Sequence, residues 1–239
     1  MSASVALQGV PSLFGNTIRR SFVLGRIYLV FGIGYALLVA ILTSFDSPTA
    51  FVSALSLFLP VFAVIGSMGG LAVFTGDRLR GVFEYLIAYG VSPRRLFVNV
   101  LAAGLVLVTL VLGSALAFGL GLYLARGHTI SFDLAAFLGL YAIPMSYASA
   151  AFAGTVGMFW TTLSSPRQGL NGPLGLMPIV GIAPAFLTLI GAAVVAAEYG
   201  ASYLLVVTSL AVVILTAVVL LLLSQISRLL PLERLLSPA

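Results

Sequence analysis

The residues with the most chemistry to offer gather in one short polar segment, residues 76–95, of an otherwise apolar chain. This segment carries four of the chain's 11 basic residues and two of its six acidic residues. Because only 7% of the chain is charged, such a concentration predicts a surface for a partner. The charged residues are Asp77, Arg78, Arg80, Glu84, Arg94 and Arg95.

Catalytic chemistry has little support elsewhere in the chain. The single histidine, His128, follows Arg126 in a polar stretch, where it reads as a solvated loop residue rather than a base. The run Gly66-Ser67-Met68-Gly69 faintly resembles an intramembrane serine protease, but an activated serine needs a membrane-embedded histidine that this chain lacks. We therefore expect a protein that is not an enzyme.

Nucleotide and metal sites are also poorly supported by residue types. The chain has no lysine and therefore no phosphate-binding loop of the Gly-x-x-x-x-Gly-Lys-Ser/Thr type. It has no cysteine, which removes disulfides and thiolate-ligated metals. We expect no cofactor and no metal on this chain.

Composition places the chain in a membrane. Of its 239 residues, 61% are hydrophobic, and the mean hydropathy is +1.21, well above what water-soluble domains show. Each of six apolar runs is long enough to cross the hydrocarbon core as a helix. The predicted fold is therefore all-α, one polytopic domain over residues 1–239, with spans at 27–45, 51–74, 96–125, 134–162, 174–197 and 203–224.

Two features qualify these predicted helices. Pro144 interrupts the fourth run, and Pro173, Pro178 and Pro184 crowd the fifth, so we expect that helix to bend or its first turns to be unwound. Small residues four apart, such as Gly66 and Gly70, predict close packing between helices.

The arginines predict the orientation. Ten of the 11 fall on one side of the predicted spans and only Arg126 on the other, so both termini should be cytoplasmic in a multi-pass plasma-membrane protein. This bias also explains the net charge of +5 without nucleic acid, which we exclude as a partner. The lipid bilayer is the expected surrounding.

An interfacial helix is predicted ahead of the first span, over residues 12–24. Phe14, Ile18 and Phe22 recur at intervals of four, while Arg19 and Arg20 lie elsewhere on the helical wheel. This division favours a helix lying in the inner membrane interface.

A second short helix is predicted inside the polar segment. Val82, Phe83, Leu86 and Ile87 form one apolar face at spacings of three and four. The charged residues Arg78, Arg80 and Glu84 would face water or a partner. A glycine, Gly90, ends the helix, and the Ser92-Pro93 pair begins the next one.

The polar segment and the layout together resemble the membrane subunits of ABC-2 type transporters, which have the type V exporter architecture. The similar residues read Asp77-Arg78, Gly81-Val82-Phe83-Glu84, Leu86-Ile87 and Gly90-Val91-Ser92-Pro93-Arg94. The chain departs from the family at Val82, where threonine is common, and at Gly90, where proline is common. The connection 198–202 is also short for the re-entrant helices that many members carry between spans five and six.

The resemblance implies a permease of an ATP-driven exporter, with the segment acting as a coupling helix. Two such membrane subunits, expected to be identical, would sit on two copies of an ABC ATPase that bind ATP and Mg²⁺. The residues implied in ATPase coupling are Asp77, Arg78, Arg80, Gly81, Phe83, Glu84, Leu86, Ile87, Pro93 and Arg94. Their role would be mechanical.

Two other interpretations stay open. The segment is a charged cap with Glu84 paired to Arg80, or the chain is an ion-coupled carrier or channel that uses acids near the outer ends of its spans. Those acids are Asp46, Asp133 and Glu198. Few polar groups lie along the spans, which favours an amphipathic or lipid-like cargo over a polar polymer.

Overall fold

Six long helices dominate the structure, as the apolar runs predict. The computed structural model describes residues 10–43, 48–163, 173–200 and 202–225, and this part of the chain contains helices and turns but no strand. Six of its helices are long and apolar enough to cross a membrane. The long helices are α2 (Val10–Thr43), α3 (Pro48–Leu79), α5 (Pro93–Ala125), α7 (Ile143–Leu163), α8 (Pro173–Tyr199) and α9 (Ser202–Ser224).

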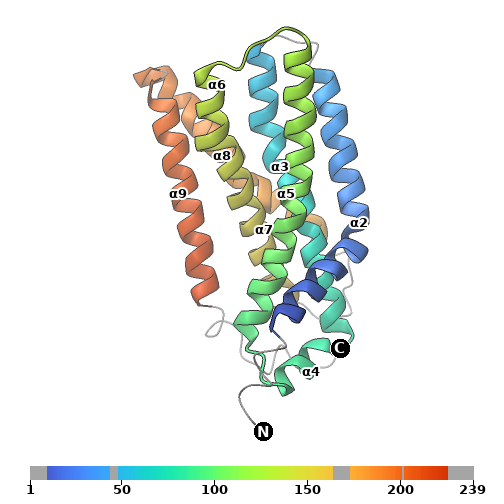
Figure 1. Ribbon diagram of the computed structural model, residues 1–239. Helices are drawn as coiled ribbons and strands as arrows, with labels where there is room; N and C mark the ends of the chain where they lie inside the picture. Colours follow the sequence, from blue (N-terminus) through green and yellow to red (C-terminus); the bar gives the residue numbers. More distant parts are fainter. Residues whose placement is uncertain (1–9, 44–47, 164–172, 201, 226–239) are drawn as a thin grey trace.

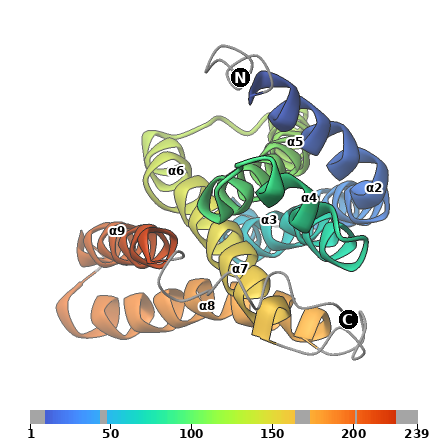
Figure 2. The same ribbon diagram turned by 90° about the horizontal axis from the view of Figure 1, so that it is seen from below.

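Helix α3 lies at the centre of the bundle. It packs against α2, α5, α7 and α8, and 72% of its candidate span is buried, compared with 17% for α8 and for α9. Figure 2 shows α2, α3 and α5 grouped on one side, with α7 between them and the α8–α9 pair. The ends of α3 are therefore fixed by several neighbours.

Glycines bring these helices into close contact. A methyl group placed on Gly70 would lie 2.9 Å from the Cα of Gly104 in α5, and one on Gly25 of α2 would lie 2.8 Å from the Cα of Gly69. Such short approaches maximise dispersion contacts where lipid offers no hydrophobic driving force between helices. The predicted close packing is confirmed, and Gly70 makes its close contact with a helix of the same chain.

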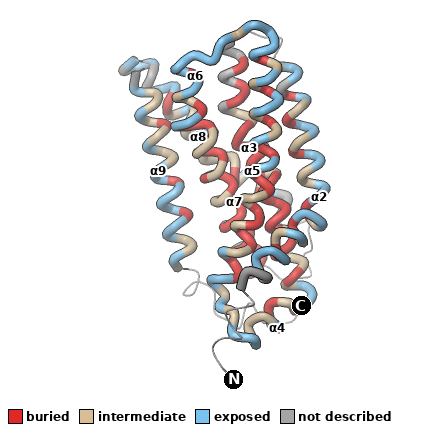
Figure 3. Tube along the Cα trace, in the orientation of Figure 1, coloured by how far each residue is buried: buried red, intermediate tan, exposed pale blue. Residues whose placement is uncertain are grey.

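The outer faces of the bundle are apolar. Figure 3 shows buried residues concentrated along the middle of the bundle and exposed residues around its outside. The exposed side chains on α8 and α9 are largely aliphatic and aromatic, for example Phe186, Leu187, Val213 and Leu221. An aliphatic outer surface of this extent suits lipid rather than water, so the protein is a multi-pass membrane protein.

The first helix differs from its prediction. The sequence predicts an interfacial helix at 12–24 followed by a span at 27–45, whereas α2 runs as one helix from Val10 to Thr43. No proline separates the two parts, so the backbone hydrogen bonds can continue through Gly25. Figure 1 shows the first turns of α2 running obliquely to its remainder, across the lower end of the bundle.

The fourth span contains a local irregularity before Pro144. It consists of α6 (Phe132–Phe137), the π-helical segment η1 (Leu138–Ala142) and α7. The amide of Ile143 donates to the carbonyl of Leu138, five residues earlier. Because proline at 144 cannot donate to residue 140 and its ring crowds that carbonyl, the wider turn of η1 accommodates it without breaking the span.

The fifth span is helical throughout. Helix α8 includes Pro178 and Pro184 without interruption, so the alternative of unwound first turns is wrong. It ends at Tyr199, Gly200 adopts a left-handed φ of 98°, and α9 begins at Ser202. Since α8 is one continuous helix, this connection holds no re-entrant pair.

We predict that Gly70→Ala destabilises the bundle, because its methyl group must push apart the backbones of α3 and α5. The expected loss is about 1–3 kcal/mol, as for overpacked cores. Gly113→Ala is the matched control, since a methyl group at Gly113 meets open space. The unfolding temperature of each variant is measured in detergent micelles. Equal unfolding temperatures for Gly70→Ala and Gly113→Ala would contradict the close contact.

Candidate functional site

The polar segment forms a short helix, α4 (Val82–Ala88), below the lower end of the bundle (Figure 1). Gly81 precedes it with φ of 68°, a left-handed conformation that glycine adopts at little cost. At its end, the amide of Gly90 donates to Ile87 and that of Val91 to Leu86, which is a Schellman motif.

The next helix begins where the sequence predicts. The Ser92 hydroxyl accepts a hydrogen bond from the amide of Arg95 at 3.4 Å, and Pro93 occupies the first turn of α5. Proline is favoured there because its missing amide hydrogen has no partner to lose. The predicted stop at Gly90 and start at Ser92-Pro93 are both confirmed.

One face of α4 is held against the bundle by aromatic packing. Phe83 is only 2% exposed, and its ring centroid lies 5.0 Å from that of Phe74 in α3. Phe74 in turn lies 4.9 Å from Phe97 in α5, and Phe97 lies 6.0 Å from Phe159 in α7. The apolar face predicted for this helix is confirmed, and it connects α4 to three spans.

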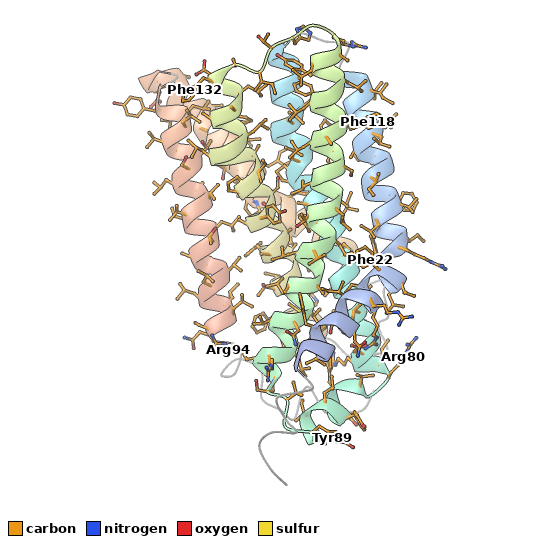
Figure 4. The ribbon with its side chains drawn as sticks, in the orientation of Figure 1. Phe22, Arg80, Tyr89, Arg94, Phe118 and Phe132 are labelled. Atoms are coloured by element: carbon orange, nitrogen blue, oxygen red, sulfur yellow. The ribbon has the colours of Figure 1, made fainter. Side chains whose placement is uncertain are left out.

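The opposite face of α4 is exposed. Glu84 is exposed, Tyr85 is 61% exposed and Tyr89 is 71% exposed. The two tyrosine rings lie 4.5 Å apart, and the hydrogen bond between their hydroxyls raises the pKa of Tyr85. Figure 4 shows Tyr89, Arg80 and Arg94 at the same end of the bundle, with Phe132 at the opposite end.

Asp77 pairs with an arginine of the same chain. It is 5% exposed, and Arg20 donates two hydrogen bonds to its carboxylate, one of them from Nη1 to Oδ2 at 2.9 Å. Within the described part of the chain this is the one ion pair. A bidentate pair of this kind fixes geometry as well as charge, so it ties the start of α2 to the end of α3.

Arg78 also binds within the bundle. Its Nη1 donates to the carbonyl oxygen of Thr161, and its Nη2 lies 3.5 Å from the carbonyl oxygen of Thr162. Both carbonyls belong to the last turn of α7, where backbone acceptors lack partners within the helix and a cation is favoured. Arg78 therefore ties α3 to α7, although the sequence predicts that it faces water or a partner.

The ten predicted coupling residues thus separate into two groups. Glu84, Arg80 and Arg94 are exposed at the lower end, and Gly81 and Pro93 shape the turns around α4. The others face the bundle fully or in part: Asp77, Arg78, Phe83, Leu86 and Ile87. Among the ion pairs of the described residues none joins Glu84 to Arg80, so the proposed cap through that pair is not formed.

Residues considered for other functions are dispersed. His128 stacks on Tyr123 with 4.6 Å between ring centroids, and the hydroxyl of Ser67 donates to the carbonyl of Val64. Asp133 and Glu198 are exposed, and Asp46 lies outside the described residues. Within residues 10–43, 48–163, 173–200 and 202–225, no group of three or more metal-binding side chains gathers.

The arrangement around α4 suits mechanical transmission rather than acid–base chemistry. Ring contacts connect Phe83 of α4 to Phe74 of α3, and Phe74 to Phe97 of α5. The links from Arg20 to Asp77 and from Arg78 to Thr161 extend this connection to α2 and α7. Packed rings and paired charges transmit displacement because they resist compression and separation.

Sequence reasoning missed the two arginine links. A usable signal was present, because Asp77 closely follows the apolar run 51–74 and a buried carboxylate requires a cation. The partner, Arg20, is 57 residues away, and pattern alone does not choose it among the 11 arginines.

Comparison of the chain with protein-family models, with curated proteins and with solved structures found no match. The function of the protein must therefore be inferred from its own residues and their geometry.

We predict that Arg20 and Asp77 stabilise the bundle as a pair. Arg20→Ala and Asp77→Ala should each lower the free energy of unfolding by about 1–3 kcal/mol, because each leaves a partly buried charge without its partner. The double variant should lose less than the sum, with a coupling of at least about 0.5 kcal/mol. Denaturant unfolding in micelles measures this cycle.

Asp133→Ala serves as the control for that cycle, because Asp133 is exposed in the first turn of α6. Its loss should stay below about 1 kcal/mol. Strictly additive losses for Arg20 and Asp77 would show that the two side chains do not interact in the membrane protein.

Proposed function

We propose that this protein is the permease subunit of an ATP-driven exporter of the ABC-2 type, with α4 as its coupling helix. The observation that carries the proposal is the two-sided character of α4. Phe83 anchors one face in the bundle, while Glu84 and Tyr85 present the other face beyond the ends of the spans. A helix that connects a partner to several spans needs both properties.

The exposed end offers a compact docking surface for an ATPase. Arg80, Glu84 and Arg94 supply charges of both signs, and Tyr85 and Tyr89 supply exposed aromatic area. Tyrosine and arginine are enriched at the centres of protein interfaces, where ring and guanidinium contacts contribute most of the affinity. In this proposal Asp77 and Arg78 hold the surface in place instead of touching the partner.

The mechanism follows from these attachments. Two copies of the chain would sit on two ATPase subunits, which carry ATP and Mg²⁺, and closure of the ATPase dimer would displace α4. Phe83 of α4 packs against Phe74 of α3, which in turn packs against Phe97 of α5. A partner that binds two positions of α4 with different affinity would therefore bias two arrangements of the spans. This chain would contribute no catalytic group.

The surroundings of the spans support an apolar or amphipathic cargo. Hydroxyl groups along the spans are mostly bonded to carbonyls of their own helix, as for Ser146 to Ala142 and Thr109 to Leu105. Groups satisfied in this way offer few hydrogen bonds to a polar polymer. We therefore favour a lipid-like substrate exported across the plasma membrane.

We predict that Glu84→Lys releases the ATPase. The tagged chain, purified in mild detergent from its native cells, should retain a stoichiometric soluble ATPase, and the variant should retain at least tenfold less. The physical reason is charge reversal at an exposed interface position, where a like charge opposes docking. Co-purified protein and ATP hydrolysis are the two readouts.

Glu198→Lys is the matched control, since it reverses an exposed acid at the opposite end of the bundle. It should keep the ATPase. A wild-type chain that purifies without any ATPase, together with loss of ion-driven transport in Glu198→Lys or Asp133→Asn, would replace this proposal with an ion-coupled carrier or channel.

We also predict that both termini and α4 face the cytoplasm, because ten of the 11 arginines lie on that side of the spans. Cysteines introduced at Ser2, Glu84 and Ala239 of this cysteine-free chain should react with an impermeant thiol reagent only after cells are opened. A cysteine at Gly127 should react in intact cells, and the reverse pattern would overturn the orientation.

A further inference from the structure

A cleft of about 580 Å³ opens between the start of α2, the end of α3, α4 and the start of α5. Figure 1 shows the first turns of α2 crossing above α4 at the lower end of the bundle, which is where this cleft lies. Its volume falls within the range of sites that bind small molecules. The packing of the spans leaves this space unfilled, although α4 and α2 both border it.

The charge of the cleft is strongly positive. Three arginines line it, Arg19, Arg20 and Arg80, against one carboxylate, Asp77. Asp77 is already bound by two hydrogen bonds from Arg20, while Arg80 lies close enough to Arg20 for the two like charges to repel. The charges of Arg19 and Arg80 therefore exceed those of the acids that line the cleft, and an anion bound beside Arg80 would offset its repulsion of Arg20.

The remaining walls are mostly apolar. Leu24 of α2, Phe83 of α4 and Val100 of α5 line the cleft, together with the amide side chain of Asn99. A free inorganic anion would leave these apolar walls in water, whereas an amphiphile would cover them. The cleft thus has the two-part chemistry of a lipid that carries a negative headgroup.

The position of the cleft favours a membrane lipid over a soluble ligand. It lies where α2 and α5 enter the apolar part of the bundle, so acyl chains can extend along the exposed apolar surface of α2, which includes Ile27, Val30 and Phe31. Basic pockets between membrane helices on the cytoplasmic side are suited to acidic lipid headgroups.

We propose that this cleft binds the phosphate headgroup of an anionic phospholipid from the adjoining leaflet, with Arg19 and Arg80 as the phosphate-binding residues. Arg20 serves as a positioning residue, because it holds Asp77 and so keeps α2 against α3. The cleft shares Arg80 and Tyr85 with the surface proposed to dock the ATPase, but most of its lining belongs to α2, the apolar face of α4 and α5. Lipid binding is therefore measured on the purified chain, without the ATPase. Lipid bound here would connect the oblique start of α2 to α4.

Native mass spectrometry with defined lipids tests the proposal. The detergent-purified chain is titrated with dioleoylphosphatidylglycerol, with dioleoylphosphatidylcholine, or with inorganic phosphate alone. We expect the anionic dioleoylphosphatidylglycerol to bind at least tenfold more tightly than the zwitterionic dioleoylphosphatidylcholine. Inorganic phosphate at millimolar concentration should neither bind nor displace it.

The variant Arg19→Gln/Arg80→Gln should lose about 10- to 30-fold in affinity for the anionic lipid, the loss expected for two arginines near the headgroup. Arg94→Gln/Arg95→Gln is the matched control, because it removes the same charge from the same end of the bundle outside the cleft. The control should keep its affinity within about threefold.

A second variant, which changes no charge, tests the cleft even if loss of the arginines disturbs folding. Asn99→Phe places a ring in the cleft from α5 and should block the anionic lipid while leaving all arginines in place. Equal losses in the two arginine double variants, unchanged binding in Asn99→Phe, or displacement of lipid by inorganic phosphate would each overturn the proposal.

Discussion

The close approach of α3 to α2 and α5 is the contact on which the rest of the structure depends. It is possible because Gly69 and Gly70 present no side chain where Gly25 and Gly104 cross them. Dispersion between closely packed backbones replaces the hydrophobic effect, which does not drive association between helices surrounded by lipid. This packing sets where α3 ends and α5 begins, and α4 occupies the space between those two ends.

Charge is used sparingly and in two distinct ways. Asp77 and Arg78 stand at the end of a buried helix, where an unpaired charge would be costly, and each is bonded to a neighbouring span. Arg80 and Glu84, a few residues further along, are exposed. The boundary between charges bonded within the bundle and exposed charges therefore falls within one short segment.

The connection between the last two spans bears on the proposed exporter. Helix α8 is continuous and meets α9 through a short connection at Gly200. An exporter built on this chain would close its outer end with side chains and the short α8–α9 turn, without a re-entrant pair. If the basic cleft binds lipid as proposed, that lipid would contact both the first turns of α2 and α4.

The helices and their turns could be predicted from local residue patterns. Apolar runs of sufficient length must become helices in lipid, and six of them were predictable, as were the turns at Gly90 and Ser92-Pro93, because both depend on local backbone chemistry. The apolar face of α4 could also be predicted, since Phe83, Leu86 and Ile87 lie within two turns of each other in the sequence.

The contacts between distant residues, in contrast, depend on how the helices pack. Arg20 lies 57 residues from Asp77 and Arg78 lies 83 residues from Thr161, and no spacing rule links such positions. Local propensity also did not predict the uninterrupted α2 and α8. In lipid a helix must satisfy its backbone hydrogen bonds within itself, and this requirement outweighs the lower propensity of glycine and proline. The basic cleft arises from four elements meeting, and each contributes only a few of its residues.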